Sequence, residues 1–130
     1  MTPQQEILSA AQALVNVFGQ HDTRAYFEAF SPDATFMFHN VPQRLDNRAA
    51  YEALWAEWEK DGFKVLSCES SNQHVQLLGD IAIFTHDVKT RLRNNDGEFT
   101  SAERETIVFQ HVSGGAWLAV HEHLSAPTVA

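Results

Sequence analysis

Two short segments near the C-terminal end of the chain carry the residues best suited to bind a small molecule and move a proton. The first contains Arg104 and Thr106, and the second is the alternating run His121-Glu122-His123-Leu124-Ser125. A guanidinium group binds a carboxylate through a planar fork, and an imidazole titrates near neutral pH. Together these groups suit an anionic ligand and acid–base chemistry on it.

Alternation along the two predicted strands determines which of these side chains share a face. If the strands form a hairpin, one face carries the polar residues Arg104, Thr106, His121, His123 and Ser125. The other face carries the apolar residues Ile107, Phe109, Leu118, Val120 and Leu124. We expect the polar face to be concave and to form one end of a pocket, and the apolar face to be convex and to support self-association. In the alternative, the apolar face packs on the only core and the polar face meets water, and a β-bulge would shift either assignment.

Three aromatic residues from the first half of the chain are expected to wall the same pocket, namely Tyr26, Phe38 and Trp55. The candidate catalytic residues are His121, His123 and Tyr26, because an imidazole or a phenol can hold and transfer a proton at a ligand. A guanidinium group nearby would disfavour a protonated imidazole, which leaves a neutral ring able to accept a proton. No Gly-x-Ser-x-Gly motif is present, so the sequence does not support a serine nucleophile.

Two imidazoles on one face of a strand also suggest a metal site. A third ligand to join His121 and His123 would have to come from His86 or Glu69, and no spacing selects either. The chain has no His-Glu-x-x-His motif and a single cysteine, Cys68. We therefore predict neither a metal ion nor another cofactor.

Length and charge restrict the class of protein further. The 130 residues, 44% of them hydrophobic, suit one domain over 1–130 with its own core. The formal net charge is −8, whereas binding to phosphate groups or anionic lipids requires clustered positive charges. Neither nucleic acid nor a membrane surface is therefore a predicted partner. No apolar run approaches the roughly 18 residues of a membrane span, and no signal-peptide pattern is present. The predicted location is therefore cytoplasmic.

Helical patterns fill the first half of the chain. Thr2 is a suitable N-cap before Pro3, and apolar residues then recur at three- and four-residue steps until Gly19. Asp22 is suited to cap a second short helix, and Asp46 or Asn47 a third. The pattern predicts helices at about 3–19, 22–30 and 47–61, a break at 31–33 and a short strand at 34–39.

The second half switches to strands separated by turn signals. Gly79-Asp80, Asn94-Asn95-Asp96-Gly97 and Ser113-Gly114-Gly115 delimit predicted strands at 63–78, 81–93, 100–112 and 116–125, with a frayed tail from Ala126 onward. Helices followed by long antiparallel strands are typical of an α+β fold. Strands of this length twist and bend, so the helices can close one face of a curved sheet.

Several of these segments resemble a known family. The matching segments are Ser31-Pro32-Asp33-Ala34-Thr35, Arg104-Glu105-Thr106-Ile107-Val108-Phe109, Ala116-Trp117-Leu118-Ala119-Val120 and the run from His121 to Ser125. They resemble SnoaL-like proteins of the nuclear-transport-factor-2-like superfamily, especially the calcium/calmodulin-dependent kinase II association domain and its bacterial relatives. The resemblance follows the element order over the whole chain. It implies a cone-shaped fold with N-terminal helices on a strongly curved, mostly antiparallel sheet that encloses a pocket, assembly into dimers or rings, and carboxylate binding by Arg104.

The same superfamily includes Δ5-3-ketosteroid isomerase. Aligned on Asp33-Ala34-Thr35, its catalytic base falls near Phe38 and its oxyanion-binding acid near Thr106. Neither residue can perform those roles, and alternation points the neighbouring His39 away from the Phe38 side. Steroid isomerisation is therefore not expected.

The resemblance and the residues together predict a small-molecule binding domain whose ligand is anionic or carries a carboxylate. We expect a homodimer or higher homo-oligomer through the convex sheet face. An isomerase-, dehydratase- or cyclase-like activity stays open. The alternative function is that of an assembly module that resembles the kinase association domain and catalyses nothing.

Overall fold

The computed structural model describes residues 1–127. The elements of this part of the chain are α1 (Pro3–Gly19), α2 (Thr23–Glu28), β1 (Phe30–Phe38), α3 (Arg48–Lys60), β2 (Lys64–Leu78), β3 (Ile81–Asn94), β4 (Gly97–His111) and β5 (Trp117–Ser125). Most of the tail predicted from Ala126 onward, residues 128–130, lies outside the described residues. None of the helices in residues 1–127 has the length and apolar character needed to span a membrane.

Helix α1 begins and ends where its sequence predicts. The Thr2 hydroxyl accepts a hydrogen bond from the Gln5 backbone N–H at 3.1 Å, and the Gln5 side chain accepts one from the Thr2 backbone N–H at 2.8 Å. This capping box satisfies N–H groups that have no partner within the helix. At the other end, a Cβ on Gly19 would lie 3.1 Å from the backbone nitrogen of Cys68, so the glycine lets α1 approach β2 closely.

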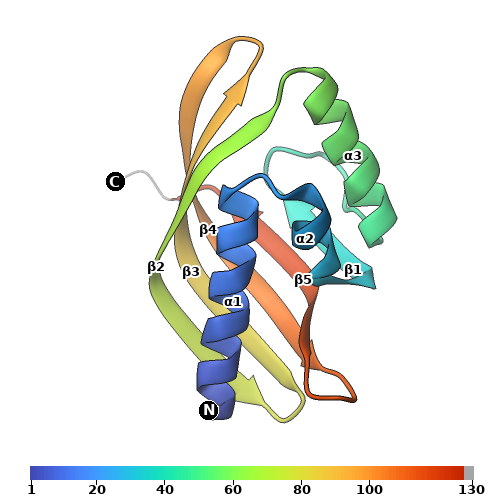
Figure 1. The fold of residues 1–130 in the computed structure, drawn as a ribbon, viewed down its shortest axis with the longest axis vertical. Helices are drawn as coiled ribbons and strands as arrows, with labels where there is room; N and C mark the ends of the chain where they lie inside the picture. The colour runs from blue at the N-terminus through green and yellow to red at the C-terminus, as the bar shows by residue number, and fades with distance from the viewer. Residues whose placement is uncertain (128–130) are drawn as a thin grey trace.

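Side-chain caps also define the start of the two shorter helices. The Asp22 carboxylate accepts from the Ala25 N–H at 3.2 Å, and the Asn47 side chain accepts from the Ala50 N–H at 2.8 Å. After α3, the Asn95 N–H donates to the Asp61 carbonyl at 3.0 Å. This bond ties the tip of the β3–β4 hairpin to the end of α3, and the two lie side by side in Figure 1.

The strands form one sheet in the order β1-β5-β4-β3-β2, in which β1 runs parallel to β5 and the other pairs are antiparallel. The sheet curls without closing, and α1 lies across its concave side (Figure 1). The predicted α+β fold, with helices on a curved and mostly antiparallel sheet, is confirmed. Strand β1 begins at Phe30 and so includes residues 31–33, for which the sequence predicts a break. The irregularity appears instead as a shift in the register of β1 with β5 between Phe30 and Thr35.

A bulge in β5 corrects the predicted faces of the sheet. Val108 pairs with His121 but the next residue, Phe109, pairs with Ala119, so β5 holds one extra residue at Val120. We call the face that packs on the helices the inner face; before the bulge it receives Ala119, and after the bulge it receives Glu122. Uninterrupted alternation predicts that His121 and His123 share a face with Ala119. Because of the bulge, they lie on the opposite face.

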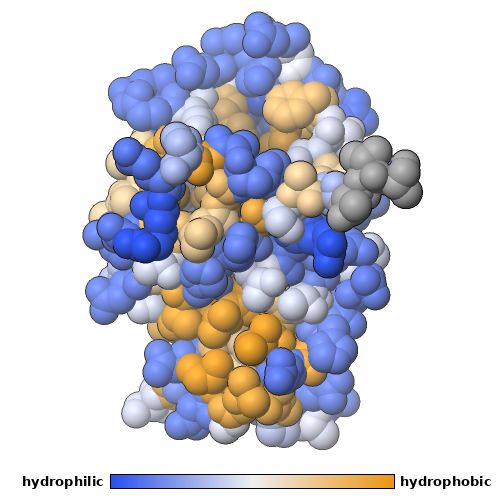
Figure 2. Space-filling model, turned by 180° about the vertical axis from the view of Figure 1, so that it is seen from behind, coloured by the Kyte–Doolittle hydropathy of each residue, from blue (hydrophilic) through white to orange (hydrophobic). Residues whose placement is uncertain are grey.

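The opposite, outer face has an apolar part and a polar part. Residues that alternate along the strands with buried inner residues point to the outer face. On its apolar part these are Leu78, Ile81, Ile83, Val108 and Leu118. Figure 2 shows apolar side chains gathered on the lower half of this side of the molecule. We call this surface the outer apolar patch.

Candidate functional site

A chamber opens between α3 and the inner face of the sheet, under the β3–β4 hairpin. Its volume is about 350 Å³, which is in the range of small-molecule sites. Phe99, 45% exposed, lies at its edge, whereas Trp55, 1% exposed, belongs to the core. The chamber therefore leads from the surface into the protein interior. Its aromatic lining comprises Phe18, Phe38, Tyr51, Trp55, Trp58, Phe63 and Phe99.

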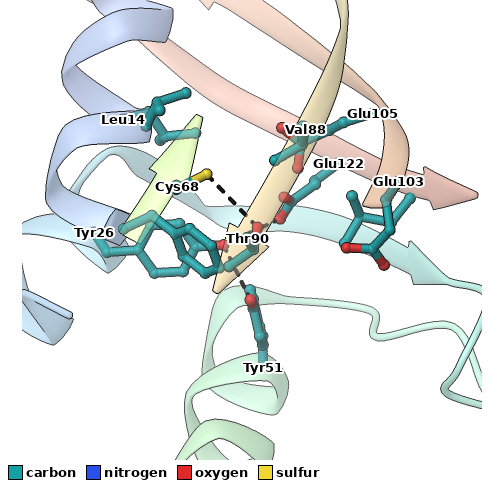
Figure 3. Close-up of a pocket in the computed structure, with 12 residues that line it drawn as sticks. Leu14, Tyr26, Tyr51, Cys68, Val88, Thr90, Glu103, Glu105 and Glu122 are labelled. Atoms are coloured by element: carbon teal, nitrogen blue, oxygen red, sulfur yellow. Dashed lines mark hydrogen bonds between the residues drawn. The ribbon is translucent and has the colours of Figure 1, made fainter. Parts of the chain in front are cut away.

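A smaller cavity of about 40 Å³ forms the deep end of this chamber. Tyr51, Thr90, Glu103 and Leu124 line both spaces, so the two are adjacent, and we call them together the inner cavity. In Figure 3 the carboxyl groups of Glu103, Glu105 and Glu122 come from the sheet, and the hydroxyl groups of Tyr26 and Tyr51 approach from the helices. The deep end thus combines polar groups with apolar walls.

The tyrosine hydroxyl groups form a short hydrogen-bonded chain to a carboxyl group. Tyr26 Oη lies 3.0 Å from Tyr51 Oη and donates to Glu122 Oε1 at 3.3 Å. Because a phenol has only one proton, the Tyr51 hydroxyl is then the donor to Tyr26. Helices α2 and α3 therefore both contribute to holding the carboxyl group of β5.

Burial controls the protonation of the glutamates at the deep end. Desolvation raises the pKa of Glu122 well above its usual range, and the charge of Glu105 raises it further. Desolvation also raises the pKa of Glu105, and the charge of Glu103 adds to the effect. Two interacting carboxyl groups in a dry site titrate as a pair. The pair therefore keeps a proton at pH values at which exposed glutamates have lost theirs.

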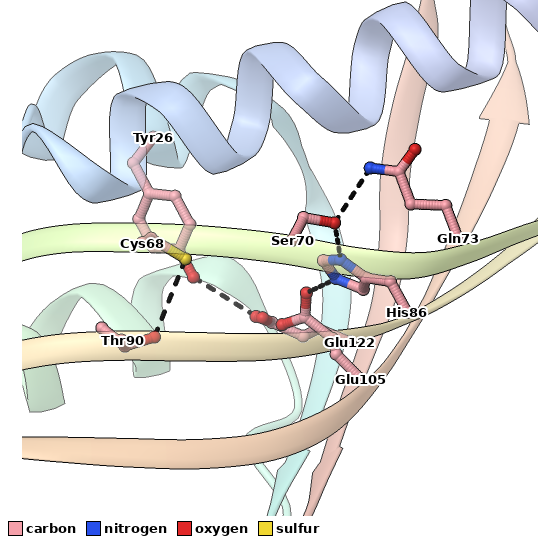
Figure 4. Close-up of polar contacts among 8 residues, drawn as sticks. All are labelled: Tyr26, Cys68, Ser70, Gln73, His86, Thr90, Glu105 and Glu122. Carbon is pink, nitrogen blue, oxygen red and sulfur yellow. Dashed lines mark hydrogen bonds and ion pairs between the residues drawn. The ribbon is translucent and has the colours of Figure 1, made fainter.

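A second hydrogen-bonded chain connects Glu105 to the edge of the sheet (Figure 4). Gln73 Nε2 donates to Ser70 Oγ at 2.9 Å, Ser70 Oγ lies 2.5 Å from His86 Nδ1, and His86 Nε2 lies 2.6 Å from Glu105 Oε1. Burial lowers the pKa of His86 to about 4, so the ring is neutral at neutral pH. A neutral imidazole carries one ring proton, so His86 donates a hydrogen bond to one of its two partners, Ser70 and Glu105, and accepts one from the other.

The structure divides the residues predicted for a single pocket between the two faces of the sheet. Tyr26 and Trp55 lie on the helix side with Phe38. Arg104, Thr106, His123 and Ser125 line a separate polar depression of about 340 Å³ on the outer face. His121 is also on the outer face, where its Nδ1 lies 2.8 Å from Thr35 Oγ1. The five polar side chains of β4 and β5 share one face, as alternation predicts, but it is the outer face, because Glu105, Ile107 and Phe109 of β4 are buried against the helices. The prediction that all eight side chains share one concave pocket, and that Ile107 and Phe109 lie on a convex face, is therefore wrong.

Sequence reasoning missed the glutamates of the inner cavity. Glu105 is in phase with the buried Ile107 and Phe109, and Glu122 is in phase with Leu124. A charged residue in phase with an apolar row is a signal of a buried functional group, because such a charge is expensive to desolvate. In residues 1–127 no three histidine, cysteine or acidic side chains are grouped to hold a metal ion.

Comparison with known proteins agrees with this architecture. Residues 7–129 match the family model for the SnoaL-like domain. The chain belongs to the SnoaL-like domain family. No curated protein matches the sequence of this SnoaL-like domain.

Solved structures similar to this SnoaL-like domain support the fold. An NTF2-like protein from Cytophaga hutchinsonii superposes with a TM-score of 0.82 at 12% identity, covering 98% of this chain and 100% of that one. A ketosteroid isomerase-like protein from Erwinia carotovora atroseptica has a TM-score of 0.81 at 16% identity, with 99% and 100% covered. The CaMKII hub of S. rosetta has a TM-score of 0.78 at 22% identity, with 98% of each chain covered. At these identities the likeness establishes the fold alone.

Proposed function

We propose that this SnoaL-like domain, taken as one unit over residues 1–130, binds a small and largely apolar molecule in its inner cavity. The adjacency of the aromatic chamber and the polar deep end, which share four lining residues named above, carries this proposal. The aromatic walls exclude water from the body of a ligand, and Tyr51 and Glu122 can position one polar group at its end.

An anionic ligand, as the sequence predicts, fits this cavity poorly. The predicted carboxylate anchor, Arg104, lines the outer depression, and the lining of the inner cavity in residues 1–127 includes no lysine or arginine. A carboxylate would instead meet Glu103, Glu105 and Glu122, and like charges repel. The predicted binding of an anion would fall to the outer depression, where Arg104 lies with Thr106, His123 and Ser125 but also beside Asp87.

A matched pair of blocking substitutions tests the proposal. Ser101 lines the chamber, whereas the next residue, Ala102, is exposed on the other face of β4. Ser101→Trp should fill the chamber and weaken binding of the neutral fluorescent probe 1-aminoanthracene by about tenfold or more. Ala102→Trp adds the same side chain outside the cavity and should leave binding unchanged. Equal effects of the two substitutions, or no binding to the unaltered protein, would contradict the proposal.

Assembly is the second candidate function, and the outer apolar patch favours it. An exposed apolar sheet face is suited to pair with a second copy of itself. One of the similar structures is itself a hub domain. We propose a homodimer or higher homo-oligomer through this face. Isomerase-, dehydratase- or cyclase-like turnover and a cytoplasmic location stay predictions; of the candidate catalytic residues, only Tyr26 reaches the inner cavity.

A further inference from the structure

The side chains of the inner cavity lining that can carry a charge near neutral pH are all acidic, within residues 1–127. Carboxyl groups of Glu103, Glu105 and Glu122 line the deep end, and Asp61 lies in the outer chamber. The lining within residues 1–127 contains no lysine, arginine or histidine that would neutralise them. His39 contacts Glu103 and the neutral His86 contacts Glu105, so these carboxyl groups have hydrogen-bond partners but no lysine or arginine from the cavity lining in residues 1–127.

Besides these acidic side chains, the chamber has aromatic walls, and aromatic rings also attract positive charge. The rings of Tyr51 and Trp58 are 6.2 Å apart and nearly perpendicular, and those of Trp58 and Phe63 are 5.4 Å apart. Tilted neighbouring rings present both faces and edges to the space between them. The face of an aromatic ring attracts a cation, most strongly when water is excluded.

Glu103 marks the position at which the charged and aromatic parts of the cavity meet. It lines both the chamber and the deep end, and its side chain is only 13% exposed. His39 Nε2 lies 2.7 Å from Glu103 Oε2 and orients the carboxyl group from the rim. Tyr51 lines both spaces as well, so a carboxyl group and an aromatic ring are available at this position.

We propose that the inner cavity takes an organic cation, an amine whose ammonium group lies against Glu103 and Glu122 while its apolar body packs among the aromatic rings. This inference rests on the proposed function and adds the class of ligand. The ammonium group would donate hydrogen bonds to the carboxyl oxygens, which are stronger than those between neutral groups.

Binding of a cation at this place is coupled to loss of a proton. Without ligand the Glu105–Glu122 pair retains a proton because burial raises the pKa of both groups. A bound ammonium group favours the ionised carboxylate, so the proton is released and affinity rises with pH. The other titratable groups that face Glu122 are Tyr26 of α2, Tyr51 of α3, Cys68 of β2, His86 of β3, and Glu103 and Glu105 of β4.

Three indole compounds of nearly equal size and different charge test the inference. Tryptamine is a cation, tryptophol is neutral and indole-3-acetate is an anion. Isothermal titration calorimetry should give an affinity for tryptamine about tenfold or more above that for tryptophol, with indole-3-acetate weakest. Titrations in two buffers of different ionisation enthalpy should show a proton released on binding of tryptamine alone.

Two substitutions test whether Glu103 causes the preference for the cation. Glu103→Gln, at a partly exposed position, should fold normally and reduce the preference for tryptamine over tryptophol to near unity. Glu69→Gln removes the same charge from an exposed site on β2 and should leave the preference intact. Circular dichroism verifies that each variant is folded.

The outcomes separate this inference from the proposed function. Tryptophol binding as tightly as tryptamine, or failure of tryptamine to displace 1-aminoanthracene, would overturn the cation assignment and leave cavity binding in place. If the unaltered protein binds neither the probe nor any of the indoles, the proposed function fails as well.

Discussion

Glu105 of β4 and Glu122 of β5 face the same buried cavity from neighbouring strands, each paired in register with an apolar residue of the other strand. Glu105 pairs with Leu124, and Glu122 pairs with Ile107. Both glutamates are almost fully buried, at 8% and 3% exposure. Two carboxyl groups so placed destabilise the folded protein when both are ionised, and a site that binds a ligand is a reason to keep them.

Replacing Glu122 with glutamine should make the protein more stable at alkaline pH. Since the folded pKa of Glu122 is raised, the folded state binds more protons than the unfolded state above about pH 4.5, and stability falls as pH rises toward the folded value. The amide of Glu122→Gln carries no charge and still accepts from Tyr26. Thermal unfolding from pH 5 to 9 should show a Tm difference in favour of the variant that increases with pH. A difference that is constant over this range, or that Glu69→Gln reproduces, would contradict the assignment.

His86 should control stability in acid, with the opposite sign. Burial lowers the pKa of His86 to about 4, so between about pH 6.5 and 4 the unfolded state binds a proton that the folded state does not. The stability of the unaltered protein falls over this interval, by at most about 3 kcal/mol. His86→Gln removes the titration at the cost of the bonds to Ser70 and Glu105. Urea unfolding at pH 4.5 and 7 should show a smaller loss for the variant, and an equal loss in both proteins would refute the role of His86.

The elements of this protein follow from its sequence to a greater extent than its cavity does. Thr2, Asp22 and Asn47 cap the helices because their side-chain oxygens satisfy nearby backbone N–H groups, which is a local interaction. The extra residue at Val120 has no such local signal. A single bulge reverses the faces of all later residues in a strand, so Ala119 lies on the inner face while His121 and His123 lie with Arg104 on the outer face.

The composition of the cavity also depends on long-range packing. Tyr26, Tyr51 and Glu122 come from three elements that are far apart in the sequence, and only the curl of the sheet brings them together. Hydrophobic patterning by itself assigns glutamates to solvent, so it gives no indication that Glu105 and Glu122 are buried. The sequence shows that Glu105 alternates in step with Ile107 and Phe109. Only the register of β4 with β5 shows that this row faces the core and that Glu122 lies beside it.

Arg104→Ala should leave the inner cavity unaffected. Arg104 is exposed in the outer depression, and the sheet separates it from the chamber. The variant should bind 1-aminoanthracene within about twofold of the unaltered protein, and its Tm should stay within a few degrees, as is usual for surface substitutions. Fluorescence titration and thermal unfolding measure both quantities. A loss of probe binding without unfolding would return Arg104 to the cavity and reverse the assignment of faces.

Leu118→Glu should prevent self-association through the outer apolar patch. Leu118 pairs with Gln110 and lies near Ile81 and Ile83 on the outer face, so a glutamate there would place an unpaired charge in the centre of the contact. Burial of an unpaired charge costs several kcal/mol, which raises the dissociation constant by at least about tenfold. Ser9→Glu adds the same side chain on the exposed side of α1 and is the matched control. Sedimentation velocity should detect an oligomer for the unaltered protein and for Ser9→Glu, and a monomer for Leu118→Glu; an oligomer that persists in Leu118→Glu would exclude this face as the interface.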